Sequence, residues 1–230
     1  LDKKTKELLV APADNVTNFE GIQFLVENPY WEGAKISLYS AGEESIASMP
    51  NIKVGKFITQ VILQNIEVED IDLSNATDLR SAWVQNNPAL QKLDLSYSTI
   101  WGQGDKETEG NGTYGSSLMV LGCPILKEIK LPEKNELKAY RIDIECLDAL
   151  ETFDMSNVKM VAELSIGDLN KDFNLVYPEL TIFYSEDGYA GTYFACSENT
   201  FYRESTQAFL KANYTDIDPD DTVRRLGYTS

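Results

Sequence analysis

The chain has 230 residues, 43% of them hydrophobic, which is enough to bury one core or two small ones. Its formal net charge is −17, and such a charge repels the phosphate backbone of nucleic acids as well as anionic membrane surfaces. The sequence contains no histidine, which excludes Ser-His-Asp and Cys-His catalysis and every metal site that uses histidine.

The first 57 residues follow no regular apolar spacing and predict an N-terminal cap, residues 1–57. The stretch 19–31 is rich in aromatic residues and irregular, whereas 33–38 carries a short alternation typical of one strand. Proteins built from stacked strands leave an open sheet edge at each end, and we expect this cap to shield the first edge.

Residues 58–185 repeat one apolar pattern. The segment 84–96 aligns with 120–132 after a shift of 36 positions, and both contain the frame Leu-x-x-Leu/Ile-x-Leu. The last apolar position of each copy recurs mostly at steps of 11 residues, at Leu73, Val84, Leu95, Val120, Leu131, Ile142, Met155 and Ile166. Alternation within each copy is the period of a strand with one buried face, and the Asn-, Ser- and Pro-rich residues between copies predict turns. Two strands per coil predict a solenoid with two parallel sheets around a thin apolar core.

The regular spacing is interrupted between Leu95 and Val120. The segment 101–115 there is acidic and rich in glycine, which predicts a loop. It contains Trp101 and Tyr114, whose rings could contact a sugar face or a protein ligand. The alternative is that both rings pack on the edge of the solenoid and hold the loop in place, and the sequence leaves both interpretations open.

Residues 186–230 predict a C-terminal cap. Ser205 is a suitable N-cap for a short helix that ends near Asn213, with Phe209 and Leu210 buried against the last coil. The segment 216–221 has part of the spacing of a calcium loop, but glycine is missing at the sixth position and glutamate at the twelfth. We therefore expect a polar tail there.

The segment 71–96 resembles the short alternating leucine-rich repeats of bacterial surface proteins, such as the internalins and the repeat proteins of gut-dwelling Gram-negative bacteria. In that family an Asn or Cys side chain hydrogen-bonds backbone in the turn, and Asn87 and Cys123 occupy equivalent positions. The resemblance covers about residues 58–185 and implies a predominantly β leucine-rich-repeat solenoid with irregular coils and little helix. It also implies an extracellular protein, or one on a bacterial outer surface, that binds macromolecules and has no catalytic activity. A lipid anchor outside this chain is compatible with it, and no membrane-spanning segment is expected because no apolar run reaches roughly 18 residues.

Residues between two buried positions of one strand point outward and are expected to form two rows. One row contains Asp72, Asp94, Lys130, Asp154 and Tyr184, and the other contains Trp83, Met119, Arg141 and Ser165. Trp, Met and Arg are enriched at interface centres, so Trp83, Met119 and Arg141 are the candidate ligand-binding residues, together with the two loop aromatics. The alternative is that Trp83, Met119 and Arg141 pack on one another, cation over ring, as an ordinary sheet surface.

No metal and no cofactor are expected. Calcium could neutralise Asp72 and Asp94, but side chains in a row across strands converge poorly on one ion. The pattern therefore favours a solvated acidic face, in which Lys130 reduces the repulsion between the carboxylates. The three cysteines contain no Cys-x-x-Cys pair, which excludes a zinc ribbon. Buried thiols are the favoured state of Cys123, Cys146 and Cys196, and one disulfide with one free thiol stays open.

The sequence therefore predicts a non-enzymatic binding module whose partner is a host or bacterial surface protein or glycan. One alternative is a structural envelope protein that assembles without a soluble ligand. Another is a carboxylate-dependent glycoside hydrolase, which requires two carboxylates held in one pocket.

Overall fold

The structure is a computed structural model that describes residues 7–10, 16–27, 35–40, 46–98, 117–133, 137–170, 172–179, 185–186, 189–190 and 193–213. Trp101 and Tyr114, the predicted 101–115 loop, Tyr184 and the calcium-like segment 216–221 lie outside these residues.

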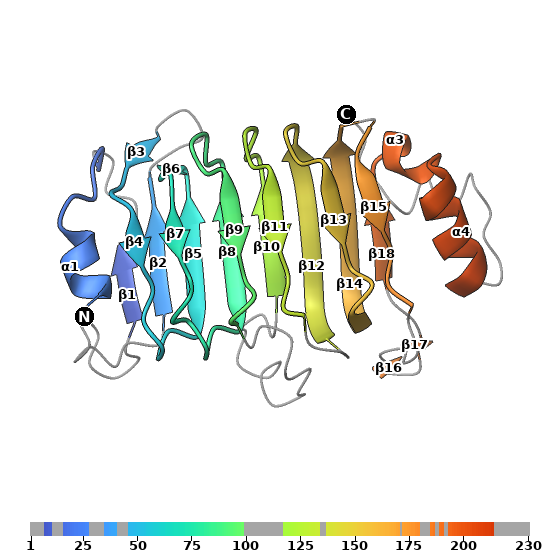
Figure 1. Cartoon of the computed structure of the whole chain (residues 1–230), viewed down its shortest axis with the longest axis horizontal. Helices are drawn as coiled ribbons and strands as arrows, with labels where there is room; N and C mark the ends of the chain where they lie inside the picture. Colours follow the sequence, from blue (N-terminus) through green and yellow to red (C-terminus); the bar gives the residue numbers. More distant parts are fainter. Residues whose placement is uncertain are drawn as a thin grey trace.

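One sheet of eight strands runs the length of the molecule, and all its neighbouring strands are parallel (Figure 1). In spatial order the strands are β1 (Glu7–Val10), β2 (Lys35–Tyr39), β5 (Gln60–Gln64), β8 (Ser81–Gln85), β10 (Ser117–Leu121), β12 (Leu137–Leu147), β14 (Val158–Leu169) and β18 (Tyr193–Cys196). This spatial order is also the order along the chain, so the sheet grows by one strand with each circuit of the chain.

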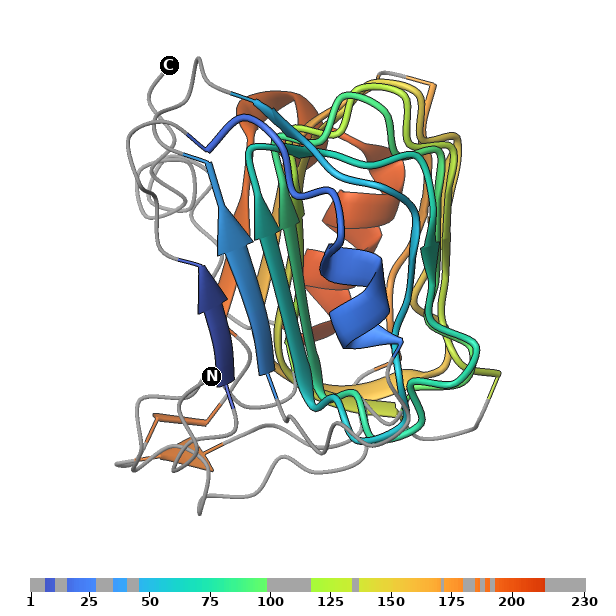
Figure 2. The same ribbon diagram turned by 90° about the vertical axis from the view of Figure 1, so that its left-hand side faces the viewer.

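Between consecutive strands of this sheet the chain returns along the opposite face of the molecule (Figure 2). Short parallel pairs lie there: β3 (Ala47–Ser48) with β6 (Ile66–Glu67), β4 (Ile52–Lys53) with β7 (Ile71–Asp72), β9 (Lys92–Asp94) with β11 (Glu128–Lys130), and β13 (Thr152–Asp154) with β15 (Asn174–Val176). A separate antiparallel pair joins β16 (Ser185–Glu186) to β17 (Tyr189–Ala190). The predicted architecture of parallel sheets with little helix is confirmed.

One continuous apolar core lies between the two faces. Residues on both faces contribute to it, because alternate side chains of the described strands point to opposite sides of a sheet. The largest fully buried side chains are Ile36, Leu38, Ile58, Leu63, Ile66, Leu79, Leu90, Leu93, Leu95, Leu118 and Phe153.

The shift of 36 positions seen in the sequence is the strand register on both faces. Ser81 pairs with Ser117 in the large sheet, and Leu93 pairs with Ile129 on the opposite face. The next circuit is longer than expected, because Val120 pairs with Ile144 and not with Ile142. The prediction at Ile142 was wrong because both isoleucines face the core, so the apolar pattern cannot distinguish a displacement of two residues.

A column of left-handed residues lies at or close to the C-terminal ends of five strands of the large sheet. The φ values are 54° for Asn65, 53° for Asn86, 63° for Gly122, 54° for Cys146 and 44° for Asp168. Each of these residues comes directly after a residue of the same paired row across the sheet. The amide Nδ2 of Asn86 donates to Oδ1 of Asn65 at 2.8 Å, which links two members of the column. Asn is one of the few side chains that tolerate this backbone region, so the turns repeat at the same level of the structure.

Asn87 and Cys123 have the turn role that the family resemblance implies. Oδ1 of Asn87 accepts hydrogen bonds from the backbone N–H of Ala89 and of Leu90, both at 3.0 Å, and from that of Val68 at 3.4 Å. Sγ of Cys123 contacts the backbone carbonyl of its own turn, at 3.6 Å. Both side chains are buried, and buried polar groups are normally hydrogen-bonded in this way.

Gly122→Ala is expected to lower the free energy of unfolding by about 1–3 kcal/mol. Its backbone has φ +63°, and an added Cβ would lie 2.5 Å from Oδ1 of Asn86, which is itself held by Asn65. Gly55→Ala is the matched control, because the nearest atom to its added Cβ is 3.8 Å away. Urea unfolding of both variants tests this, and equal midpoints would contradict it.

Short helices lie at the two ends of the described chain: α1 (Ile22–Val26) at one end, and α3 (Glu198–Phe201) and α4 (Glu204–Asn213) at the other (Figure 1). The predicted burial of Phe209 and Leu210 is confirmed, but α4 begins at Glu204, so Ser205 lies inside the helix and is not its N-cap. Among the described residues, no helix has the length and apolar character needed to cross a bilayer. Strands β1 and β2 lie within the expected N-terminal cap yet extend the large sheet, and the boundary of that cap stays a prediction.

Candidate functional site

One row of residues on the outward face of the large sheet contains Trp83 and Met119, two of the predicted ligand-binding residues. Side by side across the strands lie Ser37, Ile62, Trp83, Met119, Asp143, Ser165 and Ala195. Trp83 and Met119 are neighbours, as predicted. Arg141 is not in this row, because it pairs with Ser117 and Glu163, two residues further back along β12. The longer circuit before β12 moves Asp143 into the place expected for Arg141.

Trp83 is a half-buried aromatic side chain with a defined orientation. Its indole N–H donates to Oε1 of Gln85 at 3.2 Å, and that oxygen also accepts from Nε2 of Gln64 at 2.9 Å. Ile62 and Met119, both buried, occupy the paired positions on the two neighbouring strands. Met119 is only 8% exposed, so Trp83 offers most of the contact surface of this pair.

Arg141 belongs to a charged cluster that the repeat pattern did not predict. Its Nη2 lies 2.6 Å from Oδ2 of Asp143, and its Nη1 lies 3.8 Å from Oε2 of Glu163. Tyr140 donates its hydroxyl to the other oxygen of Glu163 at 3.1 Å. The side chain of Asp143 is 4% exposed, and a buried carboxylate of this kind needs a charged partner. The pattern Arg-x-Asp on one strand, with both side chains on the same face, is the signal that could have identified the pair.

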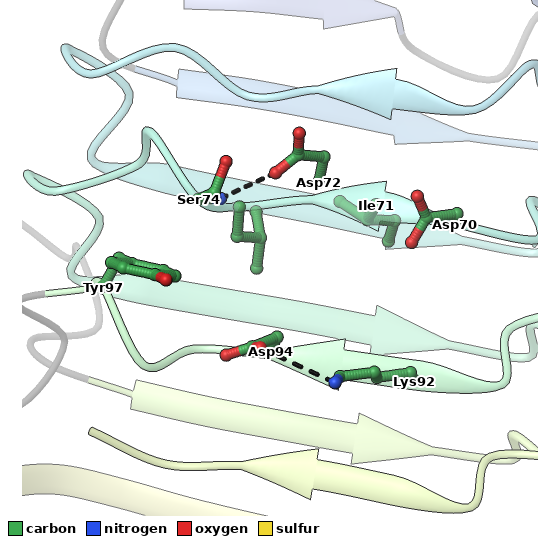
Figure 3. A pocket seen from close by; sticks show the side chains of 8 residues that line it. Asp70, Ile71, Asp72, Ser74, Lys92, Asp94 and Tyr97 are labelled. Carbon is green, nitrogen blue, oxygen red and sulfur yellow. Dashed lines mark hydrogen bonds and ion pairs between the residues drawn. The ribbon is translucent and has the colours of Figure 1, made fainter. Parts of the chain in front are cut away.

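A groove lies on the opposite face, between β7 and β9 (Figure 3). The cavity measures about 200 Å³ and is lined by Asp70, Ile71, Asp72, Leu73, Ser74, Lys92, Asp94 and Tyr97. Strand β7 pairs with β4, and β9 pairs with β11, but within residues 46–98 no ladder joins β7 to β9. The groove therefore opens where the hydrogen-bonded surface of this face is interrupted.

Asp72 and Asp94, on the two sides of the groove, are held by their own turns. Oδ1 of Asp72 accepts from the backbone N–H of Ser74 at 2.9 Å, and Oδ1 of Asp94 accepts from that of Ser96 at 3.0 Å. The same geometry recurs in a third turn. The motif Asp-x-Ser marks all three turns in the sequence, at 72–74, 94–96 and 154–156. Such side-chain bonds fix a carboxylate without a partner from another strand.

Lysines neutralise these carboxylates more directly than predicted. Nζ of Lys53 lies 3.0 Å from Asp72, and Nζ of Lys92 lies 3.7 Å from Asp94 and 3.1 Å from Glu128. The sequence predicted that Lys130 would reduce the charge repulsion within the acidic row. In the structure, the charge of Lys130 lowers the pKa of Asp94, after the larger effects of Ser96 and Lys92.

Both carboxylates have pKa values below their ordinary range. For Asp72, hydrogen bonds from the side chain and backbone of Ser74 lower the pKa, assisted by Lys53. For Asp94, burial raises the pKa, but hydrogen bonds from Ser96 and the charge of Lys92 outweigh it. Both groups are therefore ionised at neutral pH and act only as hydrogen-bond acceptors.

The cysteines are free thiols in two different environments. Cys123 and Cys196 are buried, and burial raises their pKa values to about 11 and about 12. The expectation of burial was wrong for Cys146, which is exposed at its left-handed position. In the described ranges, no three acidic or cysteine side chains are grouped closely enough to hold a metal ion.

The structure thus presents two surfaces with ligand-binding chemistry, the sheet face around Trp83 and the groove around Tyr97. Comparison with known proteins finds no matching family model, and no curated protein or solved structure that matches the chain.

Proposed function

We propose that this protein is a non-enzymatic binding module built as a leucine-rich-repeat solenoid, located outside the cell or on a bacterial outer surface. Its ligand is a protein or glycan of a host or bacterial surface. The alternation of strands between two faces supports the solenoid, because each circuit of the chain adds one strand to the large sheet. The turn hydrogen bonds of Asn87 support the resemblance to leucine-rich repeats.

The orientation of Trp83 is the observation that carries the binding function. A half-buried indole fixed by Gln85 loses little side-chain entropy when a ligand covers it. The charged cluster of Arg141, Asp143 and Glu163 lies two to three strands away and supplies polar groups at the side of this aromatic centre. Aromatic centres with polar surroundings are typical of binding interfaces.

Asp72 and Asp94, two of the three carboxylates that line the groove, favour binding over glycoside hydrolysis. A hydrolase of this class needs one carboxyl group with a raised pKa, which protonates the leaving group. The pKa values of Asp72 and Asp94 are both lowered, so neither is suited to this role at neutral pH.

Trp83→Ala is expected to weaken ligand binding by at least tenfold, because truncation of an aromatic anchor removes the centre of the contact. Ligands are first identified by screening the purified chain against a glycan array and a panel of extracellular proteins, and affinities are then measured by biolayer interferometry. Tyr202→Ala is the matched control, because Tyr202 is an exposed aromatic residue that lies away from this face, directly after α3.

Two results would contradict the proposal. One is an unchanged affinity of Trp83→Ala for every ligand found. The other is the absence of any ligand combined with hydrolysis of a substrate. Thermal unfolding of the variant must give a midpoint close to that of the wild type, since the side chain of Trp83 faces away from the core.

A further inference from the structure

We infer that the groove between β7 and β9 binds one pyranose ring of a glycan, with Tyr97 against the apolar face of the ring and with Asp72, Asp94 and Lys92 hydrogen-bonded to its hydroxyls. This inference deepens the proposed function, on which it rests, by naming a ligand class and a site for it. The site lies on the face opposite to Trp83, so the two can be tested separately.

The size and floor of the groove fit a single ring. Its volume of about 200 Å³ is below the range of about 300–1,000 Å³ that is typical of sites for drug-sized ligands. Ile71 and Leu73 line it, and both are buried core residues that form an apolar floor. Because no ladder joins β7 to β9 there, the space between the two strands is not closed by backbone hydrogen bonds.

Tyr97 provides an aromatic surface at one end of the groove (Figure 3). Its side chain is 58% exposed, although it lies only three residues beyond Asp94 in the same turn. The turn is held by Ser98, whose backbone N–H and hydroxyl both donate to the carbonyl of Leu95, at 3.0 and 2.7 Å. The face of an aromatic ring is electron-rich and attracts the weakly positive C–H groups of a sugar.

The polar lining matches hydroxyl groups better than it matches ions. Asp72 and Asp94 accept hydrogen bonds, Lys92 donates them, and a sugar hydroxyl can do both. Anions would be repelled, because three carboxylates and only one ammonium group line the groove. A basic side chain would have to displace the lysines that already contact Asp72 and Asp94. A neutral polyol keeps these ion pairs and adds hydrogen bonds to them.

The carboxylates are also positioned before any ligand arrives. Each has one oxygen held by a backbone N–H of its own turn and the other oxygen near a lysine. Groups that are already ordered cost less entropy on binding. The lowered pKa values of both groups keep them ionised in mildly acidic solution, so binding is expected to persist at pH 5.

The experiment uses saturation-transfer NMR to screen the methyl α- and β-pyranosides of glucose, galactose and mannose, together with the glycans that bind on the array. Titration then gives the affinity of the wild type and of each variant. Tyr97→Ala and Asp94→Asn are each expected to weaken binding at least tenfold. Tyr97→Phe keeps the ring and is expected to stay within about twofold of the wild type. The control Tyr202→Ala is expected to change nothing.

Three outcomes would overturn the inference: no pyranoside or glycan binds the wild type, a bound glycan is unaffected by Tyr97→Ala and Asp94→Asn, or Tyr97→Phe loses as much affinity as Tyr97→Ala. In each case, the proposed function is decided independently by Trp83→Ala. If Tyr97→Ala does not fold, Tyr97→Leu takes its place, and the Asp94→Asn result carries the same weight.

Discussion

Phe153→Ala is expected to lower the free energy of unfolding by about 3–5 kcal/mol. Phe153 on β13 is 0% exposed and is among the largest fully buried side chains of the described chain. Removal of its ring costs the transfer of the apolar surface and leaves a cavity that packed strands can fill only in part. The core is one continuous cluster, so this cavity would lie in its interior and not under a loose end.

Chemical denaturation followed by tryptophan fluorescence measures this loss. Phe24→Ala is the matched control, because Phe24 on α1 is 77% exposed and its truncation is expected to cost less than about 0.5 kcal/mol. Similar losses for the two variants would mean that the ring of Phe153 is not buried and that the two faces do not share one continuous core.

Asn87→Ala is expected to cost about 2–4 kcal/mol, although it removes only a small polar side chain. The buried side chain oxygen accepts three backbone hydrogen bonds, and those from Val68 and Leu90 are buried. Loss of the acceptor leaves the N–H groups of Val68 and Leu90 buried and unsatisfied, and each such group costs more than the net value of one hydrogen bond.

Hydrogen exchange tests the cause of this loss as well as its size. The amides of Ala89 and Leu90 are expected to lose protection in Asn87→Ala, beyond the general decrease due to lower stability. Asn75→Ala is the control, because Asn75 is exposed in another turn. If the two variants are equally stable, the turn does not depend on the Asn87 side chain, and the main structural support for the leucine-rich-repeat resemblance is lost.

The two candidate surfaces differ in how they could bind ligands. The sheet face exposes part of the Trp83 ring within a row of otherwise buried side chains and suits contact with a macromolecule, whereas the groove around Tyr97 suits one ring of a polymer. A glycan bound in the groove and a protein bound on the sheet face would not compete, since the two surfaces face opposite sides of the core (Figure 2). The net charge of −17 disfavours anionic partners at either surface.

Several features of the fold could be predicted from the sequence, because residues buried in the core recur at a regular spacing along the chain. The shift of 36 positions is the register between β8 and β10, and the apolar pair Phe209 and Leu210 marks the buried side of α4. Side-chain alternation is a local property of each strand, so one strand's residues are enough to reveal it. The outward direction of Trp83 and its position beside Met119 could be predicted for the same reason.

Only the tertiary structure decided which residues meet across the strands. A circuit longer by two residues keeps the same alternation, so the sequence could not show that Asp143 and not Arg141 stands beside Met119. The groove depends on a missing ladder between β7 and β9, and strand pairing is a long-range contact that neither segment encodes by itself. The local pattern therefore determined the core and the direction of each side chain, whereas turn lengths and strand pairing determined the neighbours and with them the two candidate sites.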